Sequence, residues 1–82
     1  MDDAKPILQA LGGNIRARRK ALGWSQMQLA DEAGLHRTYI ADIERGGRNV
    51  SIFNITRIAV ALHTTASELC RAIEPGGPTI PL

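Results

Sequence analysis

The residue spacing with the most chemical content lies between Gln26 and Ile43. Ala30 is small enough to let two helices cross closely. Gly34 suits a tight turn, because it adopts the left-handed conformation without the penalty that a Cβ atom brings. Three apolar residues then anchor the second helix in the core: Leu35, Ile40 and Ile43. This spacing predicts two short helices at a fixed angle, the second with one face free to project.

Two helices joined in this way form a helix-turn-helix motif. In the docking geometry of this motif, the second helix enters the major groove of double-stranded DNA. Residues 37, 38, 39 and 42 face away from Ile40 and Ile43 on a helix of 3.6 residues per turn. Any chemistry of recognition is therefore expected on that face.

Helical periodicity dominates the rest of the chain, and no strand-like alternation persists. The first helix carries an apolar stripe that consists of Leu8, Leu11, Ile15 and Leu22. Gly23 ends this helix, and the Gly12-Gly13 pair predicts a late start or a loosened first turn. The second helix opens at Ser25, where Gln28 completes a capping box and Trp24 packs before the cap.

The third helix is expected over residues 37–45, ending at Gly46-Gly47. A fourth runs from Ser51 to Leu62, and its core face consists of Ile52, Ile55, Ile58, Ala59 and Leu62. Thr65 and Glu68 form a capping box that opens a short fifth helix. The sequence therefore predicts one compact all-α domain over residues 1–82, with a core at about 7–74 and mobile termini at 1–5 and 75–82.

The residue types that could form disulfides, bind metals or catalyse reactions occur without the partner residues that such chemistry requires. The single cysteine, Cys70, excludes a disulfide framework; it is expected to be a small hydrophobe on the fifth helix, with redox sensing as the other reading. His36 and His63 have no partners at metal-ligand spacing, so no metal is expected. No nucleophile with a base, no paired carboxylates and no phosphate loop are present, so we expect no enzyme, cofactor or small-molecule ligand. No apolar run approaches the roughly 20 residues that span a bilayer, which predicts a cytoplasmic protein without membrane contact.

The formal net charge of +2 conceals an uneven distribution. Residues 5–48 carry eight positive and four negative side chains, whereas residues 49–82 sum to zero. The excess therefore lies over the first three expected helices and the loop after them. A negatively charged partner is expected there.

Several motifs together give the chain a family resemblance. They are Arg16 to Arg19, Gly23-Trp24-Ser25-Gln26, Leu29-Ala30, Gly34-Leu35, Ile43-Glu44-Arg45-Gly46 and Ile58 to Leu62. Over residues 11–74 the sequence resembles the phage-repressor and Cro-like (XRE-type) helix-turn-helix regulators. The segments 35–40 and 48–51 look most like the small controller proteins of restriction–modification systems. The resemblance implies a five-helix, lambda-repressor-like DNA-binding domain.

The resemblance implies base reading by Arg37, Thr38, Tyr39 and Asp42. An arginine such as Arg37 can donate to both O6 and N7 of guanine, and Thr38 can contact a base edge or a thymine methyl group. Tyr39 is ambiguous between a base and a phosphate contact. Asp42 can accept from cytosine N4, or it can orient Arg37 or Arg45.

A second group of residues is expected at the phosphate backbone: Gln26, His36, Arg48, Asn49 and Arg16. Gln26 lies at a helix N-terminus, where free amide groups favour a phosphate oxygen; the alternative is a solvent-exposed residue. His36 either caps the third helix or contacts DNA. Arg16, Arg18 and Lys20 are either solvated or phosphate-facing, whereas the family pattern pairs Arg19 with Glu44 in a structural ion pair.

The fourth helix also carries apolar residues off its core face. Phe53 and Val60 lie seven residues apart, with Thr56 and His63 beside them. An apolar patch of this kind predicts self-association, here a homodimer formed through the fourth and fifth helices. The leading interpretation is a sequence-specific transcriptional regulator, repressor or activator, that binds an inverted repeat as a dimer. The alternative is a protein-interaction module, such as an antitoxin or adaptor, that keeps the fold without reading DNA.

Overall fold

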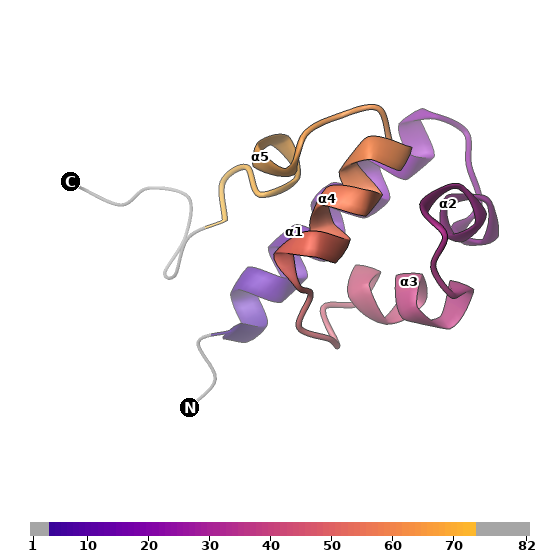
Figure 1. Ribbon diagram of the computed structural model, residues 1–82. Coiled ribbons are helices and arrows are strands. Elements are labelled where there is room, and N and C mark those ends of the chain that lie inside the picture. Colours follow the sequence, from indigo (N-terminus) through magenta and orange to yellow (C-terminus); the bar gives the residue numbers. More distant parts are fainter. Residues whose placement is uncertain (1–3, 74–82) are drawn as a thin grey trace.

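The computed structural model describes residues 4–73, and this part of the chain is all-helical, as predicted. Its helices are α1 (Ala4–Ala21), α2 (Gln26–Ala33), α3 (Arg37–Glu44), α4 (Ile52–Ala61) and α5 (Ala66–Leu69). Figure 1 shows α2 and α3 together on one side of the molecule and α5 on the other. Ala4 and Lys5, expected in a mobile terminus, are already helical; the mobility predicted for residues 1–3 and 75–82 falls outside the described residues.

The core takes large apolar side chains from four of the helices. The fully buried ones are Ile15, Leu29, Ile40, Ile43, Ile58 and Leu62. Burying each such side chain stabilises the fold by about 1.5–3 kcal/mol. Helix α3 packs against α1 and α2, and α4 packs against α2 and α5. This packing fixes α3 from two sides and leaves its remaining surface to solvent.

The Gly12-Gly13 pair does not delay or loosen α1, which runs through both residues. Gly12 is buried where α1 crosses the end of α3, and a Cβ atom there would lie 2.3 Å from the carbonyl oxygen of Ile43. Gly13 meets nothing within 4 Å. The expectation was wrong because Gly12 serves the close approach of two helices rather than the start of one.

Three predicted helix starts are confirmed by their capping hydroxyl groups. Ser25, Ser51 and Thr65 accept hydrogen bonds at 3.1 Å from the backbone N–H groups of Gln28, Asn54 and Glu68. Neither predicted capping box forms its reciprocal hydrogen bond among the described residues. In the Thr65–Glu68 box, the Glu68 carboxylate instead lies 3.9 Å from Arg71. One orphan donor is thus satisfied at each start.

Two apolar side chains are exposed: Ile52, which the sequence placed on the core face of α4, and Cys70, which it predicted as a small hydrophobe on the fifth helix. Ile52 is 70% exposed, because it is the first residue of α4 and no described element covers that turn. Cys70 ends the short α5 and is also exposed, so it does not pack as a hydrophobe. The other predicted core residues of α4, Ile55, Ile58 and Ala59, are buried, as is Leu62 after it.

Candidate nucleic-acid interface

The turn between α2 and α3 fixes the direction in which α3 leaves the core. Ala30 is buried between the helices, and the N–H group of Leu35 donates to its carbonyl oxygen at 2.9 Å. Gly34 adopts a left-handed φ of 69°, as the turn requires. Arg57 of α4 donates to the Gly34 carbonyl at 3.0 Å and closes the end of α2. Sequence reasoning missed Arg57, because its partner lies 23 residues away.

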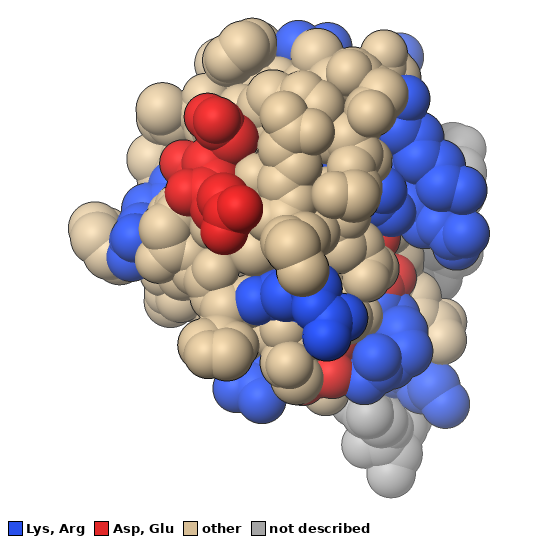
Figure 2. Space-filling model, turned by 90° about the vertical axis from the view of Figure 1, so that its right-hand side faces the viewer, with Lys and Arg blue, Asp and Glu red and all other residues tan. Residues whose placement is uncertain are grey.

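Helix α3 is divided into a buried and an outward face. Ile40 and Ile43 are buried, whereas Arg37 and Thr38 are exposed. Figure 2 shows the side of the molecule that carries α2 and α3; lysine and arginine side chains gather in its lower half and along its right edge, and an acidic patch lies at upper left. The outward face of α3 therefore belongs to a largely basic surface.

Arg37 is one of the candidate base-reading residues that no internal contact occupies. Within residues 4–73 its side chain has no hydrogen-bond or ion-pair partner. It follows directly after the turn, at the first position of α3. A guanidinium held at this point can present its fork of donors without first breaking an internal contact.

Tyr39 is half-buried, and its hydroxyl group accepts a hydrogen bond from the Asn54 side chain at 2.9 Å. The guanidinium carbon of Arg48 lies 5.1 Å from the centre of the Tyr39 ring. The tyrosine is therefore fixed between α4 and the loop that follows α3. Asn54 was not identified from the sequence, since nothing local links it to α3.

Asp42 bonds two arginines that follow it. Arg45 donates to one carboxylate oxygen and Arg48 to the other, the latter at 3.3 Å. Of the two partners expected for Asp42, Arg45 is confirmed and Arg37 is not. Arg48 is the partner that the sequence did not indicate. Asn49 is exposed beside it.

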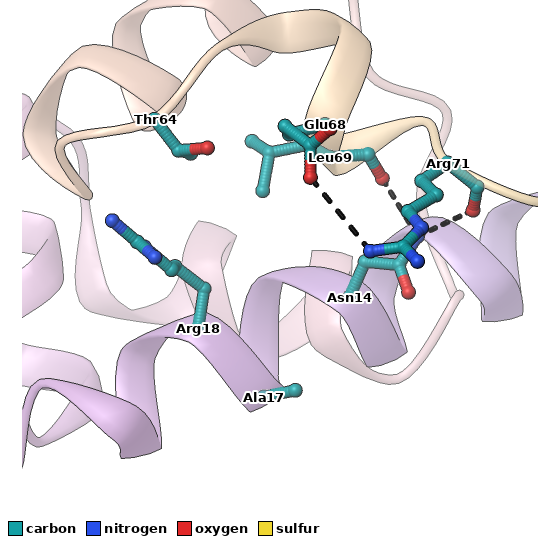
Figure 3. Close-up of a pocket in the computed structure, with 7 residues that line it drawn as sticks. All are labelled: Asn14, Ala17, Arg18, Thr64, Glu68, Leu69 and Arg71. Carbon is teal, nitrogen blue, oxygen red and sulfur yellow. Dashed lines mark hydrogen bonds and ion pairs between the residues drawn. The ribbon is translucent and has the colours of Figure 1, made fainter.

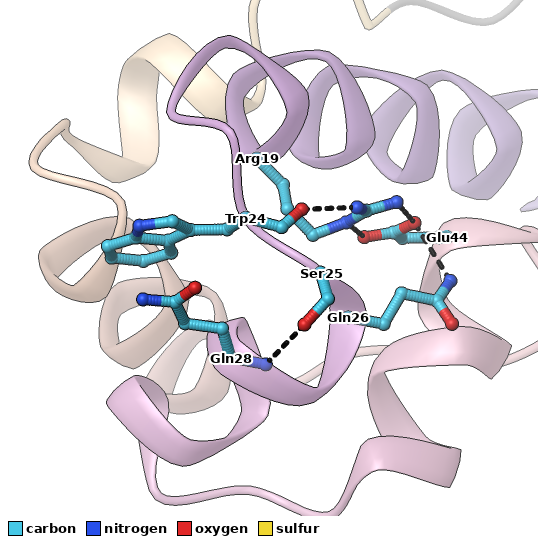
Figure 4. A network of polar contacts seen from close by, with 6 residues as sticks. All are labelled: Arg19, Trp24, Ser25, Gln26, Gln28 and Glu44. Atoms are coloured by element: carbon cyan, nitrogen blue, oxygen red, sulfur yellow. Dashed lines mark hydrogen bonds and ion pairs between the residues drawn. The ribbon is translucent and has the colours of Figure 1, made fainter.

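The structure adds detail on two of the residues expected at the phosphate backbone, His36 and Gln26. His36 occupies the N-cap position of α3, but its side chain makes no capping hydrogen bond. Gln26 is not simply solvent-exposed, because its amide donates to Oε1 of Glu44 at 3.1 Å. Figure 4 shows this amide beside the Glu44 carboxylate, at the N-terminus of α2. The Gln26 side chain is thereby already held when a ligand approaches.

The predicted ion pair between Arg19 and Glu44 is present and buried. Arg19 Nε and Nη2 donate to the two Glu44 oxygens at 2.7 and 2.9 Å, and Nη1 donates to the Trp24 carbonyl at 2.8 Å (Figure 4). The hydrogen bonds that Arg19 donates to Glu44 raise the pKa of Arg19 above its ordinary value, against the opposing effect of burial. Arg19 therefore stays charged at ordinary pH, and its bonds to Glu44 join α1 to the end of α3.

Arg18 is half-buried, and its guanidinium is already bonded within the fold. Its Nε and Nη2 groups donate to the carbonyl oxygens of Leu62 and His63, each at 2.9 Å, and so cap the end of α4. Figure 3 shows Arg18 and Asn14 reaching from α1 toward the segment around α5. Asn14 donates to Leu69 and Arg71 carbonyls at 2.8 and 2.9 Å. Arg16 and Lys20 are exposed, and Arg16 stays a candidate for phosphate contact.

The surface of α4 that faces away from the core carries two exposed apolar side chains. Phe53 and Val60 are 67% and 69% exposed. Together with Thr56 and Arg57 they line a shallow groove that reaches Glu32 and Ala33 of α2. His63 lies at the end of this helix with a left-handed φ of 59°, and its ring meets Trp24 edge-on at 6.0 Å.

Residues 4–73 contain no cluster of three or more His, Cys, Asp or Glu side chains that could hold a metal ion. Across the same residues no helix is long and apolar enough to cross a membrane. The remaining candidate binding surfaces are the outward face of α3, the loop after it and the exposed face of α4.

Comparison with known proteins gives consistent matches. A family model described as helix-turn-helix matches residues 15–69. The control protein C.SmaI from Serratia marcescens is 43% identical over 63 residues, which are 77% of this chain and 75% of that protein.

Two solved structures are also similar. The restriction–modification controller protein C.AhdI from Aeromonas hydrophila superposes with a TM-score of 0.74 at 45% identity, over 76% of this chain and 94% of that one. The controller protein C.Esp1396I, solved as a tetramer in complex with its natural 35 base-pair operator, superposes with a TM-score of 0.72 at 32% identity, over 77% of this chain and 83% of that one.

Proposed function

This chain belongs to the helix-turn-helix family, and we propose that it is a sequence-specific regulator of transcription that binds double-stranded DNA as a homodimer. The observation that carries the proposal is the division of α3. One face of α3 is buried by Ile40 and Ile43, and the other presents Arg37, which has no partner within residues 4–73. A helix so presented fits the major groove, where an arginine distinguishes guanine from the other bases.

The proposed DNA contacts fall into two groups, one to base edges and one to phosphates. Arg37 and Thr38 read base edges, with Tyr39 at their side, while Gln26, Arg48, Asn49 and Arg16 bind phosphates and set the register. The similarity to C.AhdI and to operator-bound C.Esp1396I supports a narrower assignment, a controller protein of a restriction–modification system. The chain then acts in the cytoplasm, where its DNA target lies.

The exposed face of α4 provides the dimer surface. Phe53 and Val60 are apolar and exposed. The Thr56 hydroxyl between them donates a hydrogen bond to the Ile52 carbonyl oxygen at 2.9 Å. Glu32 and Arg57 line the same groove, so a second copy turned by a two-fold axis meets opposite charges as well as apolar surface. Two recognition helices then lie about 34 Å apart, one turn of DNA.

The salt dependence of DNA binding tests the proposal. Affinity for a duplex of random sequence is expected to fall roughly tenfold or more between about 50 and 200 mM salt, because bound phosphates release counterions. Arg48→Ala reduces this dependence, whereas Arg71→Ala, the loss of an exposed arginine beyond α5, leaves it unchanged. Absence of salt-dependent binding contradicts the proposal and favours a protein-interaction module.

Sedimentation tests the dimer separately. Wild-type protein is expected to sediment as a dimer at tens of micromolar, and Phe53→Ala as a weaker one. Met27→Ala provides the matched control, because Met27 is 57% exposed but lies on α2. A monomeric wild type, or a Phe53→Ala variant that dimerises and binds DNA unchanged, contradicts this part of the proposal.

A further inference from the structure

We propose that Asp42 is a positioning residue, which sets the sequence specificity of α3 by holding the Arg48 guanidinium against the ring of Tyr39, and that it does not itself read a base. This inference rests on the proposed DNA-binding function. It concerns a connected group of side chains that we call the Asp42 cluster: Tyr39, Asp42, Arg45, Arg48 and Asn54.

The Asp42 carboxylate is occupied on both oxygens. Arg45 bonds Oδ1, and Arg48 bonds Oδ2 at 3.3 Å. The Asp42 side chain is only 20% exposed, whereas those of Arg45 and Arg48 are 67% and 52% exposed. A bare carboxylate would be repelled by phosphates, but two guanidinium groups leave this cluster with a net positive charge. Asp42 thus lies behind its arginines rather than in front of them.

Arg48 is fixed from two directions. Asp42 holds one end of its guanidinium, and the Tyr39 ring lies 5.1 Å below the guanidinium carbon. Tyr39 is fixed in turn by Asn54 of α4 at 2.9 Å. The loop itself is tied back, since the Gly47 N–H group donates to the Asp42 carbonyl at 2.9 Å. Both side chain and backbone of Asp42 therefore determine where Arg48 lies.

Orientation matters for an arginine more than for a lysine. The guanidinium is a planar fork that binds two acceptors only when its plane is aligned with them. The ion pairs of the Asp42 cluster are solvent-exposed, and such pairs contribute little to folding stability. Their effect is therefore expected in recognition. An Arg48 held in one orientation binds its phosphate in one register and so aligns the base-reading residues of α3, whereas a freely rotating Arg48 tolerates several registers.

The experiment compares binding of two duplexes, the sequence that wild type selects from a random pool and the random pool itself. In Asp42→Ala the affinity ratio of the two is expected to fall roughly tenfold, the scale of one good base contact. Affinity for the random pool does not fall, because a negative charge has been removed. Asp42→Glu, which keeps the carboxylate, recovers most of the ratio. Glu68→Ala removes the same charge from α5 and leaves the ratio unchanged.

A double variant separates positioning from direct reading. If Asp42 acts through Arg48, Arg48→Ala lowers the ratio by itself and Asp42→Ala adds no further loss to it. An unchanged ratio in Asp42→Ala overturns the inference, as does an additive loss confined to one cytosine position. If wild type itself selects no sequence, the proposed function fails and the inference fails with it.

Discussion

Two carboxylates of α3 lie two residues apart: Glu44 pairs with one arginine and Asp42 with two, in very different surroundings. The Glu44 side chain is 3% exposed and its partner Arg19 9% exposed. Asp42 is 20% exposed, with partners that lie mostly in solvent. The partner of Glu44 comes from α1, 25 residues away, while those of Asp42 come from the next six residues. Burial and chain separation, rather than the chemistry of the ion pair, therefore decide whether the pair holds the fold or shapes a surface.

The largest expected effect comes from breaking the buried pair. Glu44→Ala leaves the Arg19 guanidinium buried without its partner, which is expected to lower the free energy of unfolding by about 3–5 kcal/mol. Asp42→Ala is expected to change it by less than about 1 kcal/mol, because its pairs are exposed. Denaturant unfolding of both variants measures the difference, and equal losses would remove the distinction between the two carboxylates.

The close crossing behind Glu44 gives a second test. Gly12→Ala places a Cβ atom 2.3 Å from the Ile43 carbonyl oxygen and 2.7 Å from that of Glu44. We expect it to lower stability by about 2 kcal/mol, because neither backbone can move freely. Gly13→Ala, in the same helix but with nothing within 4 Å, is expected to raise stability by up to about 1 kcal/mol. Thermal or denaturant unfolding of the two variants measures these changes. A change in stability of the same sign in both variants would contradict the close crossing of α1 and α3.

On the outward face, Arg37→Ala is expected to change recognition without changing the fold. Loss of its contact lowers discrimination at one base pair by about 1–3 kcal/mol. Unfolding is unaffected, since Arg37 has no partner within residues 4–73. The measurement is competition binding with single-base variants of the selected duplex. An unaltered sequence preference would show that another residue reads the base.

Gln26 lies between the two regions, and its effect is expected to be the smallest. Gln26→Ala removes a hydrogen bond to buried Glu44 and a contact expected at a phosphate. Each is worth about 1 kcal/mol, so stability falls slightly and binding weakens equally for all sequences. Filter binding with selected and random duplexes measures the second effect. A loss of stability alone would confine Gln26 to supporting Glu44.

The local features of the fold were predictable from the sequence. Capping hydroxyl groups act within three residues, and periodicity identified Ile40 and Ile43 as the buried face of α3. The Arg19–Glu44 pair came from the family pattern, because nothing local joins residues that are 25 positions apart. Gly12, Arg18 and Arg57 were misjudged or missed for that same reason. Their roles depend on backbone atoms of distant elements, which periodicity does not report.

The candidate site also contains features that the sequence predicts and features that it does not. The position of Arg37 follows from the turn and the helical period. The surroundings of Tyr39 and Asp42 do not, because they depend on how the loop after α3 folds back and on Asn54 of α4. Ile52 shows that helical periodicity alone does not establish burial. The period places Ile52 on the core face of α4, but no described element covers it.

Selection of bound sequences from a pool of random duplexes tests whether two copies of this chain present two α3 helices to neighbouring turns of one DNA duplex. We expect an enriched inverted repeat with half-site centres about 10–10.5 base pairs apart, or a multiple of that spacing. Enrichment of a single asymmetric half-site, or of no sequence, would contradict this arrangement.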